Sequence, residues 1–234
     1  MIGGSGLVGT MILPHLGGEH EIRILDPKPP APGPWDYAPG DATDFARVTS
    51  AASGMDAMVY LAMGPLAGWG ETANVAAHFD ANVKGLHLAL WAAAQAGVRH
   101  AVLASSMSVY PNPPDDEAYP DPDTPPTATD FYGLTKRLGE QVGQAAVAEY
   151  GISVVALRLC LPTPDEQWPR DGDRWSRTIA TSARDTASAV DAALAYRGHG
   201  FTAVTISGDA AGRMADIGAA RRLLGWIPQD PTNP

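Results

Sequence analysis

The chain contains one cysteine, Cys160, which excludes an intramolecular disulfide and a cysteine-rich metal site. Its six histidines show no metal-ligand spacing, so no bound metal is expected, and each should lie at the surface or pack against a helix. Long apolar runs are lacking as well. None approaches the ~18 residues of a membrane span, and we therefore expect a cytoplasmic protein.

Basic residues are scarce relative to acidic ones, with 16 Lys and Arg against 26 Asp and Glu, and the net charge is -10. This balance argues against a nucleic-acid backbone or an anionic membrane surface as a partner. It does not exclude a small-molecule substrate, because a pocket can be locally basic. With 234 residues, 45% of them hydrophobic and 18% charged, the composition is that of a globular protein of ordinary domain size.

The start of the chain carries a Gly-x-x-Gly-x-x-Gly pattern, formed by Gly3, Gly6 and Gly9, which leads into an apolar run of helical type at 7–13. Glycines let the backbone turn tightly and approach a pyrophosphate closely, and the N–H groups of a helix N-terminus bind phosphate. The pattern predicts a site for the phosphates of a dinucleotide, although a glycine-rich turn by itself is weak evidence.

A buried strand normally precedes such a loop, but here only Met1 and Ile2 stand before it. Two explanations are open: the true start lies upstream, or the chain has lost the central strand of its sheet. A central parallel strand is buried on both faces, so we expect a protein of this sequence to be poorly stable.

A short strand at 21–26 ends in Asp26, about twenty residues beyond the glycines. A carboxylate at this spacing accepts hydrogen bonds from the ribose 2′-hydroxyl of NAD and would repel the 2′-phosphate of NADP, so NAD is favoured. The alternative is a strand-end aspartate that caps the turn before Pro27. The proline-rich residues 27–39 are expected to form a surface loop, and Asp41, which follows, is a candidate for the adenine amino group.

The middle of the chain alternates strands and helices. Residues 55–63 read as a buried strand that runs into a loop over the cofactor, and residues 74–96 as a long helix with apolar positions three and four apart. Asn82 lies beside that apolar stripe, where its amide could fix the neighbouring strand or simply sit at the helix edge. The next strand, 100–105, delivers Ser106 to its C-terminal end, the edge at which ligands bind in open α/β sheets.

Tyr132 and Lys136 are four residues apart and therefore share one face of a helix. A phenol normally loses its proton near pH 10, but an ammonium group beside it favours the phenolate and lowers that pKa. Tyr132 could then exchange a proton with a substrate hydroxyl or carbonyl, while a serine hydroxyl holds the substrate oxygen. A lone Tyr-x-x-x-Lys usually arises by chance. The order of glycine-rich loop, acid, strand-end serine and Tyr-x-x-x-Lys makes chance a poor explanation.

As a set, these stretches resemble the extended short-chain dehydrogenase/reductases, the NAD-dependent epimerase/dehydratase family. The matching residues are Gly3-Gly4-Ser5-Gly6-Leu7-Val8-Gly9, Asp26, Gly40-Asp41, Asn82-Val83-Lys84-Gly85, Ser105-Ser106-Met107-Ser108-Val109-Tyr110 and Tyr132-Gly133-Leu134-Thr135-Lys136. The resemblance implies an α/β Rossmann fold, a doubly wound parallel sheet with NAD across its C-terminal edge. It assigns residues 1–160 to the NAD-binding domain that carries the catalytic residues, and 161–234 to a short substrate-binding region that completes the same fold.

The resemblance also implies roles for individual residues. Ser106, three positions before the Val-Tyr pair, would orient the substrate, Tyr132 would donate and accept the proton, and Lys136 would lower the tyrosine pKa and hold the nicotinamide ribose. The residues expected to bind the cofactor are Gly3, Gly6, Leu7, Val8, Gly9, Asp26, Asp41, Ala42, Leu61, Ala62, Met63, Asn82, Tyr132 and Lys136. A homodimer through the helices at 74–96 and 131–150 is the family expectation.

The end of the chain is short for a family member that binds sugar nucleotides, and looks more like the uronate-dehydrogenase-like members, which oxidise a free sugar acid. Arg170, Arg174 and Arg177 could bind a carboxylate, or could be solvent-facing charges in a polar loop. Met107 stands where that subgroup is expected to carry a polar substrate-binding side chain. Ser106, Met107 and Arg174 are the substrate-binding candidates, and the substrate remains open.

These features predict an NAD-dependent oxidoreductase that acts on a hydroxyl or carbonyl of a sugar-like molecule. Whether it is a dehydrogenase, an epimerase or a dehydratase is left open. The alternative from another class is a catalytically inert NAD(P)-binding sensor or scaffold, or a truncated fragment. The complete set of Ser106, Tyr132 and Lys136 argues against that alternative, whereas the reduced first strand and the short substrate region argue for it.

Overall fold

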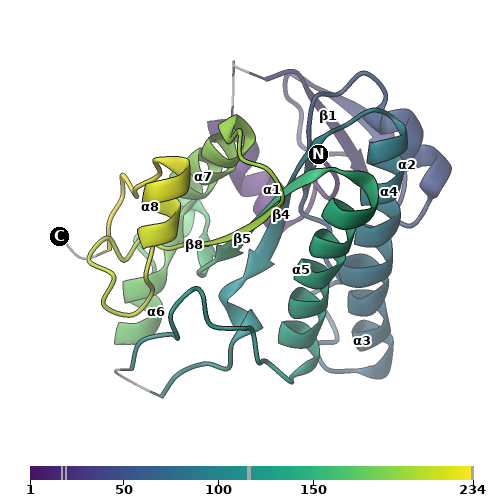
Figure 1. Ribbon diagram of the computed structural model, residues 1–234. Coiled ribbons are helices and arrows are strands. Elements are labelled where there is room, and N and C mark those ends of the chain that lie inside the picture. Colours follow the sequence, from purple (N-terminus) through teal and green to yellow (C-terminus); the bar gives the residue numbers. More distant parts are fainter. Residues whose placement is uncertain (17, 19, 115–116, 233–234) are drawn as a thin grey trace.

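The computed structural model describes the whole chain except residues 17, 19, 115, 116, 233 and 234. It is a parallel sheet covered by helices on both faces (Figure 1). The strands are β1 (Ile22–Asp26), β2 (Trp35–Pro39), β3 (Met58–Tyr60), β4 (His100–Ser106), β5 (Ser153–Leu159), β6 (Pro162–Thr163), β7 (Thr181–Ser182) and β8 (Phe201–Ile206). The helices are α1 (Leu7–Ile12), α2 (Phe45–Ala52), α3 (Thr72–Phe79), α4 (Leu86–Gln95), α5 (Phe131–Tyr150), α6 (Arg174–Ile179), α7 (Ala183–Ala195) and α8 (Gly218–Leu224).

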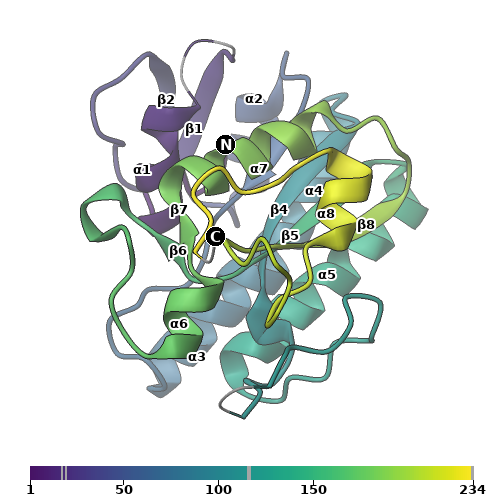
Figure 2. The same ribbon diagram turned by 90° about the vertical axis from the view of Figure 1, so that its left-hand side faces the viewer.

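The strands of the main sheet are all parallel, and their order is β2-β1, then β3-β4-β5-β8, while β6 and β7 form a separate short pair. Figure 2 shows β1 and β2 at one end of the molecule and β8 at the other. Parallel neighbours need a crossover connection, and helices supply it for the β3-β4, β4-β5 and β5-β8 pairs, whereas residues 27–34 join β1 to β2 without a helix. This arrangement is the predicted doubly wound Rossmann fold. It includes β8, so the last third of the chain contributes to the same sheet.

The first strand is reduced to a single bridge, as the sequence predicted. Among the described residues, Ile2 alone joins β1 to β3, through parallel bridges to Leu25 and Tyr60. Its N–H donates to the Val59 carbonyl (2.8 Å) and its carbonyl accepts from the Leu61 N–H (2.8 Å). A cavity of about 310 Å³ lies beside this bridge, lined by Ile2 and by residues of β1, α2 and β3.

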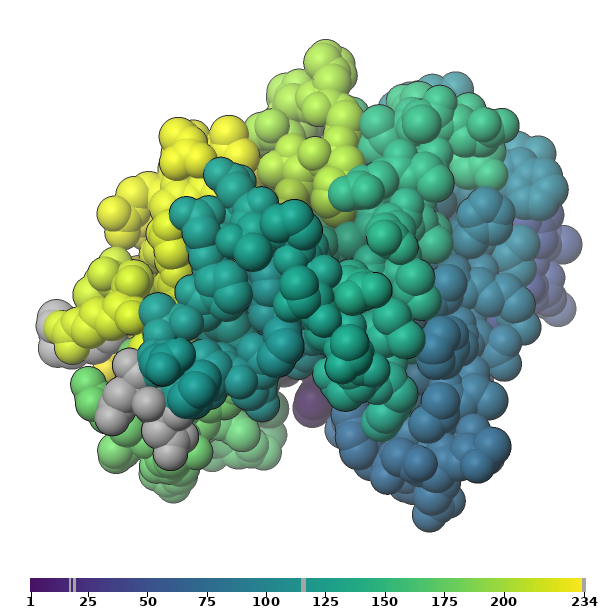
Figure 3. All heavy atoms as spheres, turned by 60° about the horizontal axis from the view of Figure 1, so that its bottom comes forward, coloured from purple at the N-terminus to yellow at the C-terminus, as the bar shows by residue number. Residues whose placement is uncertain are grey.

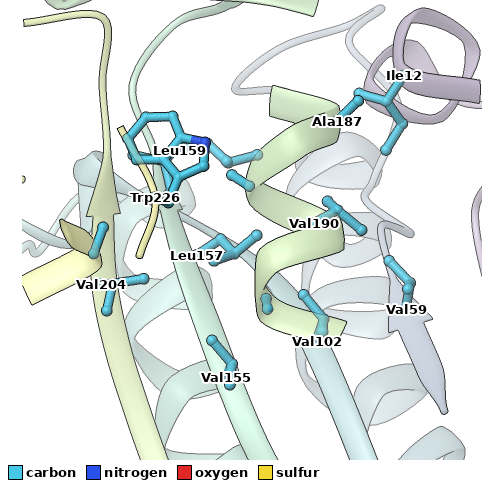
Figure 4. Packing of buried hydrophobic residues seen from close by; sticks show 14 of the residues in the cluster. Ile12, Val59, Val102, Val155, Leu157, Leu159, Ala187, Val190, Val204 and Trp226 are labelled. Carbon is cyan, nitrogen blue, oxygen red and sulfur yellow. The ribbon is translucent and has the colours of Figure 1, made fainter. Parts of the chain in front are cut away.

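Alternating residues of the strands supply two apolar layers, one on each face of the sheet. Val59, Val102 and Val155 belong to the layer under α1, α7 and α8, and Figure 4 shows such strand residues facing Ile12 and Val190. The neighbours of these valines along the chain belong to the other layer, under α2, α4 and α5. Strand side chains alternate between faces, so a sheet buried on both sides reads as a continuous apolar run.

Two elements differ from the sequence-based expectation. Residues 35–39, predicted to lie in a surface loop, form the edge strand β2, which pairs with β1 from Ile22 to Asp26. Proline is tolerated at an edge because a missing N–H costs no ladder bond there, so the prolines were a misleading signal. The predicted helix at 74–96 is a helical run from 72 to 95 that is interrupted by a π-helix, Asp80–Gly85. The strands predicted at 55–63 and 100–105 are β3 and β4.

The helices of the described residues include none that is both long enough and apolar enough to cross a membrane.

Candidate active site

The glycine-rich loop lies against the end of β3. Gly3 has a φ of +81°, and a Cβ placed there would come within 2.4 Å of the Ala62 backbone nitrogen. A Cβ on Gly9 would come within 2.3 Å of the Gly4 carbonyl oxygen, so glycine is needed for α1 to pack on its own loop. No described side chain caps α1 at Gly6. The first-turn N–H groups are thus available to a phosphate, and these positions fit a dinucleotide.

The other cofactor candidates lie around this loop in different environments. Leu7 is exposed and Val8 is half-buried on α1, whereas Ala42 and Leu61 are buried in the core. Met63 is half-buried in the segment that follows β3. In Figure 3, N-terminal atoms (purple) are visible in the recess between the green segment that contains α6 and the blue segment that precedes α3.

Asp26 ends β1 and holds the loops on either side of it. Its carboxylate accepts from the Ser5 N–H (3.0 Å) and from the Lys28 N–H (2.9 Å), so the capping alternative is observed. Each carboxylate oxygen keeps a further lone pair, and the predicted bond to a ribose hydroxyl stays compatible with this geometry. Asp41 accepts from the Thr43 N–H (2.8 Å) and hydroxyl (2.6 Å), which shapes its own turn, and its adenine contact stays a prediction.

The two adjacent serines at the end of β4 contact different residues of α5. Ser105 is buried, and its hydroxyl donates to Glu140 (2.7 Å). Ser106 lies beside the start of α5, near enough for its hydroxyl to lower the pKa of the Tyr132 phenol. The Ser106 oxygen also accepts from the Ser108 N–H (3.1 Å), which starts a short 3-10 helix. The structure therefore brings Ser106 to Tyr132 and separates it from Ser105.

Helix α5 presents Tyr132 and Lys136 on one face, as their spacing predicted. The Asp130 carboxylate caps the helix by accepting from the Gly133 N–H (2.9 Å). The Lys136 ammonium donates to the Ala104 carbonyl (2.9 Å) and lies 5.7 Å from the centre of the Tyr132 ring. Ser106, Tyr132 and Lys136 thus lie close together at the C-terminal edge of the sheet, which the predicted proton exchange with a substrate requires.

The pKa of Tyr132 moves opposite to the expectation. Burial raises it to about 12, and the Asp130 carboxylate adds to the rise while the Ser106 hydroxyl opposes it. Burial also lowers the pKa of Lys136 to about 8. Desolvation of the phenol is the dominant effect, and the Lys136 ammonium, which lies over the ring, donates its hydrogen bond to a backbone carbonyl.

A buried ionic network supports this site, and the sequence reading missed it. Arg158 of β5 binds Glu140 of α5 in a bidentate pair with both bonds at 2.9 Å, and both side chains are 5% exposed. Arg158 also donates to the Tyr110 hydroxyl and the Pro122 carbonyl. A charged residue within an apolar strand, and a glutamate one turn after Lys136, were the available signals.

Asn82 lies on the π-helix and does not bind a strand, which corrects both readings of its role. Its amide donates to the Thr135 hydroxyl (2.9 Å), so it ties the π-helix to α5 one residue before Lys136. A cavity of about 20 Å³ lies between Asn82, Lys136 and Glu140, which is room for about one water molecule. π-Helices often occur at functional sites because they reposition a side chain within a helix.

Two substrate candidates are placed differently. The Met107 side chain is 3% exposed and belongs to an apolar cluster with Tyr119 and Ile179, so it does not face the site. Arg174 is exposed and begins α6, which Figure 2 shows beside β6 and β7. Trp175 of α6 packs on the Met107 cluster. Met107 therefore supports the helix that carries Arg174.

Three rings, those of Trp69, His78 and Phe131, cluster with the ring of Tyr132, the proposed acid/base residue. Trp69 lies between α3 and α5, with its ring centre 5.3 Å from that of Tyr132 and 4.9 Å from that of Phe131. His78 meets Trp69 (5.1 Å) and Tyr132 (5.8 Å) edge-on. Burial lowers the pKa of His78, so the ring is neutral at neutral pH. The sequence predicted that residues 55–63 run into a loop over the cofactor, but not this contact.

The fold and the site together define a Rossmann-type oxidoreductase with a Ser, Tyr and Lys set beside a dinucleotide site. The model of the NAD dependent epimerase/dehydratase family matches residues 1–200, and the chain belongs to that family. This membership confirms the predicted class of enzyme, the extended short-chain dehydrogenase/reductases, and the predicted cofactor, NAD.

Individual relatives are distant but cover nearly the whole chain. The NAD-dependent glucose-6-phosphate dehydrogenase of Haloferax volcanii is 26% identical, over 98% of this chain and 92% of its own length. The uronate dehydrogenase of Pseudomonas putida is 28% identical, over 98% of this chain and 83% of its own length. A solved structure of MoeE5 in complex with UDP-glucuronic acid and NAD superposes with a TM-score of 0.80 at 21% identity, over 97% and 92% of the two chains.

Proposed function

We propose that the protein is a dehydrogenase that oxidises a hydroxyl group of a free sugar or sugar acid, with Tyr132 as the general base. The observation that carries the proposal is the meeting of Ser106, Tyr132 and Lys136 at the C-terminal edge of the sheet, beside the glycine-rich loop. These three groups supply a hydroxyl that orients the substrate, a phenol that exchanges a proton and an ammonium that favours the phenolate.

In the oxidising direction, the Ser106 hydroxyl holds the substrate oxygen next to the Tyr132 phenol. Tyr132, as phenolate, takes the proton from that oxygen. NAD, when bound, supplies the hydride acceptor. Burial raises the pKa of Tyr132 to about 12 and so opposes the phenolate, and we assign its stabilisation to the Lys136 ammonium that lies over the ring. The Arg158–Glu140 pair ties β5 to α5, and the Ser105 hydroxyl of β4 also donates to Glu140, so this network holds the end of β4 beside α5.

Two observations support a free sugar over a sugar nucleotide. The chain has a short segment between β5 and α7, with the six-residue helix α6 as its longest element. Of the two curated relatives described above, one is named for a sugar phosphate and the other for a sugar acid, neither name includes a nucleotide, and the alignments cover 98% of this chain. The arginines at 170, 174 and 177 are the candidates for an anionic substituent of the substrate. The cytoplasmic location and the homodimer stay predictions.

The replacement Tyr132→Phe tests the proposal. It should leave NADH affinity unchanged and reduce turnover by roughly 100- to 10,000-fold, because it removes the proton acceptor and keeps the ring packing. NADH fluorescence titration and the rate of NADH formation with D-glucuronate, D-galacturonate and D-glucose 6-phosphate measure the two properties. Tyr150→Phe is the matched control, since Tyr150 ends the same helix about 27 Å away. Unchanged turnover in Tyr132→Phe would contradict the assignment of Tyr132 as the general base.

The rival function is an inert NAD-binding sensor or scaffold. Binding of NADH without turnover of any of these sugars, or of UDP-glucose, would favour that function.

A further inference from the structure

Trp69 is placed directly beside the residue that the proposed reaction uses as its base. The indole contacts the Tyr132 ring at 5.3 Å between centres, with an angle of 53° between the planes. It is nevertheless 50% exposed. Half of a large apolar side chain therefore remains open to solvent at the point where the substrate hydroxyl must approach Ser106 and Tyr132.

The backbone around Trp69 holds the indole in this position. Gly68 and Gly70 flank it, with φ angles of +70° and +84°, a conformation that other residues adopt only with strain. The Asn74 amide, which is 4% exposed, donates to the Pro65 carbonyl (2.5 Å) and to the Ala67 carbonyl (3.0 Å). The loop is thus tied to α3 just before Trp69, so the position of the indole is specified by the fold.

The inner side of the indole packs against His78 and Phe131. His78 is fully buried and meets Trp69 edge-on at 79°, while Phe131 supports it from α5 at 4.9 Å. The imidazole is neutral because burial lowers the pKa of His78, with the Lys136 ammonium acting in the same direction. A neutral ring can stay packed there without a counter-ion. Trp69 therefore cannot sink further into the core and keeps an open aromatic surface.

We propose that Trp69 is the platform on which the sugar ring of the substrate rests. A pyranose presents a face of C–H groups whose partial positive charge suits the negative face of an aromatic ring. Stacking of that face on the open side of Trp69 places a ring hydroxyl within reach of Ser106 and Tyr132. The charged substituent of the sugar then points away from the indole. Trp69 is accordingly a residue that binds the ring and selects for a pyranose, and it takes no part in proton transfer.

This inference rests on the proposed function and deepens it. It predicts that Trp69 contributes to sugar binding and not to NAD binding. Trp69→Ala should raise the KM for D-glucuronate or D-glucose 6-phosphate at least about tenfold, since an aromatic face in van der Waals contact is lost. Trp69→Phe keeps a smaller face and should give an intermediate KM. The affinity for NADH should stay at the wild-type value in both variants.

Trp91 provides the matched control. This residue of α4 is 39% exposed, and its ring centre lies 4.6 Å from that of Phe45 on α2. It therefore resembles Trp69 in exposure and in having an aromatic neighbour. Trp91→Ala should leave the sugar KM and the NADH affinity unchanged. An unchanged KM in Trp69→Ala would overturn the inference. A parallel loss of NADH affinity and sugar affinity in Trp69→Ala would overturn it too, because it would show a structural role for the loop.

A binding measurement separates failure of this inference from failure of the proposed function. In the Tyr132→Phe background, D-glucuronate, D-glucose 6-phosphate and UDP-glucose are titrated in the presence of NAD while tryptophan emission is recorded. The emission should change with a sugar, keep that change in the added Trp91→Phe variant and lose it in the added Trp69→Phe variant. Turnover by the wild type with no Trp69-dependent change contradicts this inference alone. No turnover and no emission change with any of the three sugars contradicts both.

Discussion

The two ends of the sheet differ in how completely their strands are paired. On one side β4, β5 and β8 pair along their whole lengths, from His100 opposite Ser153 to Leu159 opposite Ile206, and the buried Arg158–Glu140 pair ties β5 to α5. On the other side, within the described residues, β1 and β3 meet through Ile2 alone, and a cavity of about 310 Å³ lies beside this contact.

The difference separates the proton chemistry from nucleotide binding. Ser106 and Tyr132 come from the fully paired side, so their relative position is held by the strongest part of the core. The glycine-rich loop and Asp26 come from the side with the cavity, where a local opening requires fewer contacts to break. We infer that the catalytic groups stay assembled under conditions in which the nucleotide site is already disturbed.

The largest effect should come from breaking the well-paired side. Arg158→Met leaves the Glu140 carboxylate buried and unpaired, and should cost about 3–5 kcal/mol of unfolding free energy. Urea unfolding followed by circular dichroism measures this loss. Arg184→Met is the control, because Arg184 pairs with Asp230 with half of its own side chain exposed and should cost at most about 1 kcal/mol. Equal losses in the two variants would show that the buried pair does not distinguish this side.

A smaller effect is expected on the nucleotide side. Gly3→Ala forces a left-handed φ on alanine, which costs about 1–2 kcal/mol, and adds a contact of 2.4 Å to the Ala62 backbone nitrogen. NADH affinity should fall together with the thermal midpoint. Gly54→Ala imposes the same φ strain at +76°, but no described atom lies within 4 Å of its Cβ, so it should keep NADH affinity. Loss of NADH binding in both variants would mean that strain alone disturbs the site.

The smallest expected effect is a difference in the urea concentration at which two buried thiols become labelled. Cys160 is 1% exposed at the end of β5, and burial raises the pKa of its thiol, so it should react with a thiol reagent only after large-scale unfolding. Val59→Cys in a Cys160→Ser background places a thiol beside the cavity. Mass spectrometry should find that thiol labelled at a lower urea concentration than Cys160. Labelling of both at one concentration would show that the two sides open as one unit.

Much of the fold was predictable because its signals are local. Asp130 and Gly151 mark the ends of α5 through a side-chain cap and a left-handed φ of 66°, both of which depend on neighbouring residues. The apolar runs of β4 and β5 identify strands that are buried on both faces. Strand β2 was not predictable, because the prolines of residues 27–39 are typical of loops and its pairing with β1 depends on a partner elsewhere in the chain.

The candidate site was predictable in its composition and not in its surroundings. Ser106, Tyr132 and Lys136 follow from spacing and from their place at strand and helix ends. The interior position of Met107 does not, because the 3-10 helix after Ser106 turns that side chain into the core. The raised pKa of Tyr132 could not be foreseen either, since desolvation depends on every group that packs around the phenol.

The sequence by itself determined the order of elements, the glycine loop and the set of proton-exchanging residues, because each of these rests on spacing within a few residues. Only the tertiary structure decided that Ile2 would bridge two strands, that Arg158 would find Glu140, and that Trp69 would lie against Tyr132. These contacts join residues far apart in the chain. Their geometry is set by how the strands and helices pack, which no local pattern encodes.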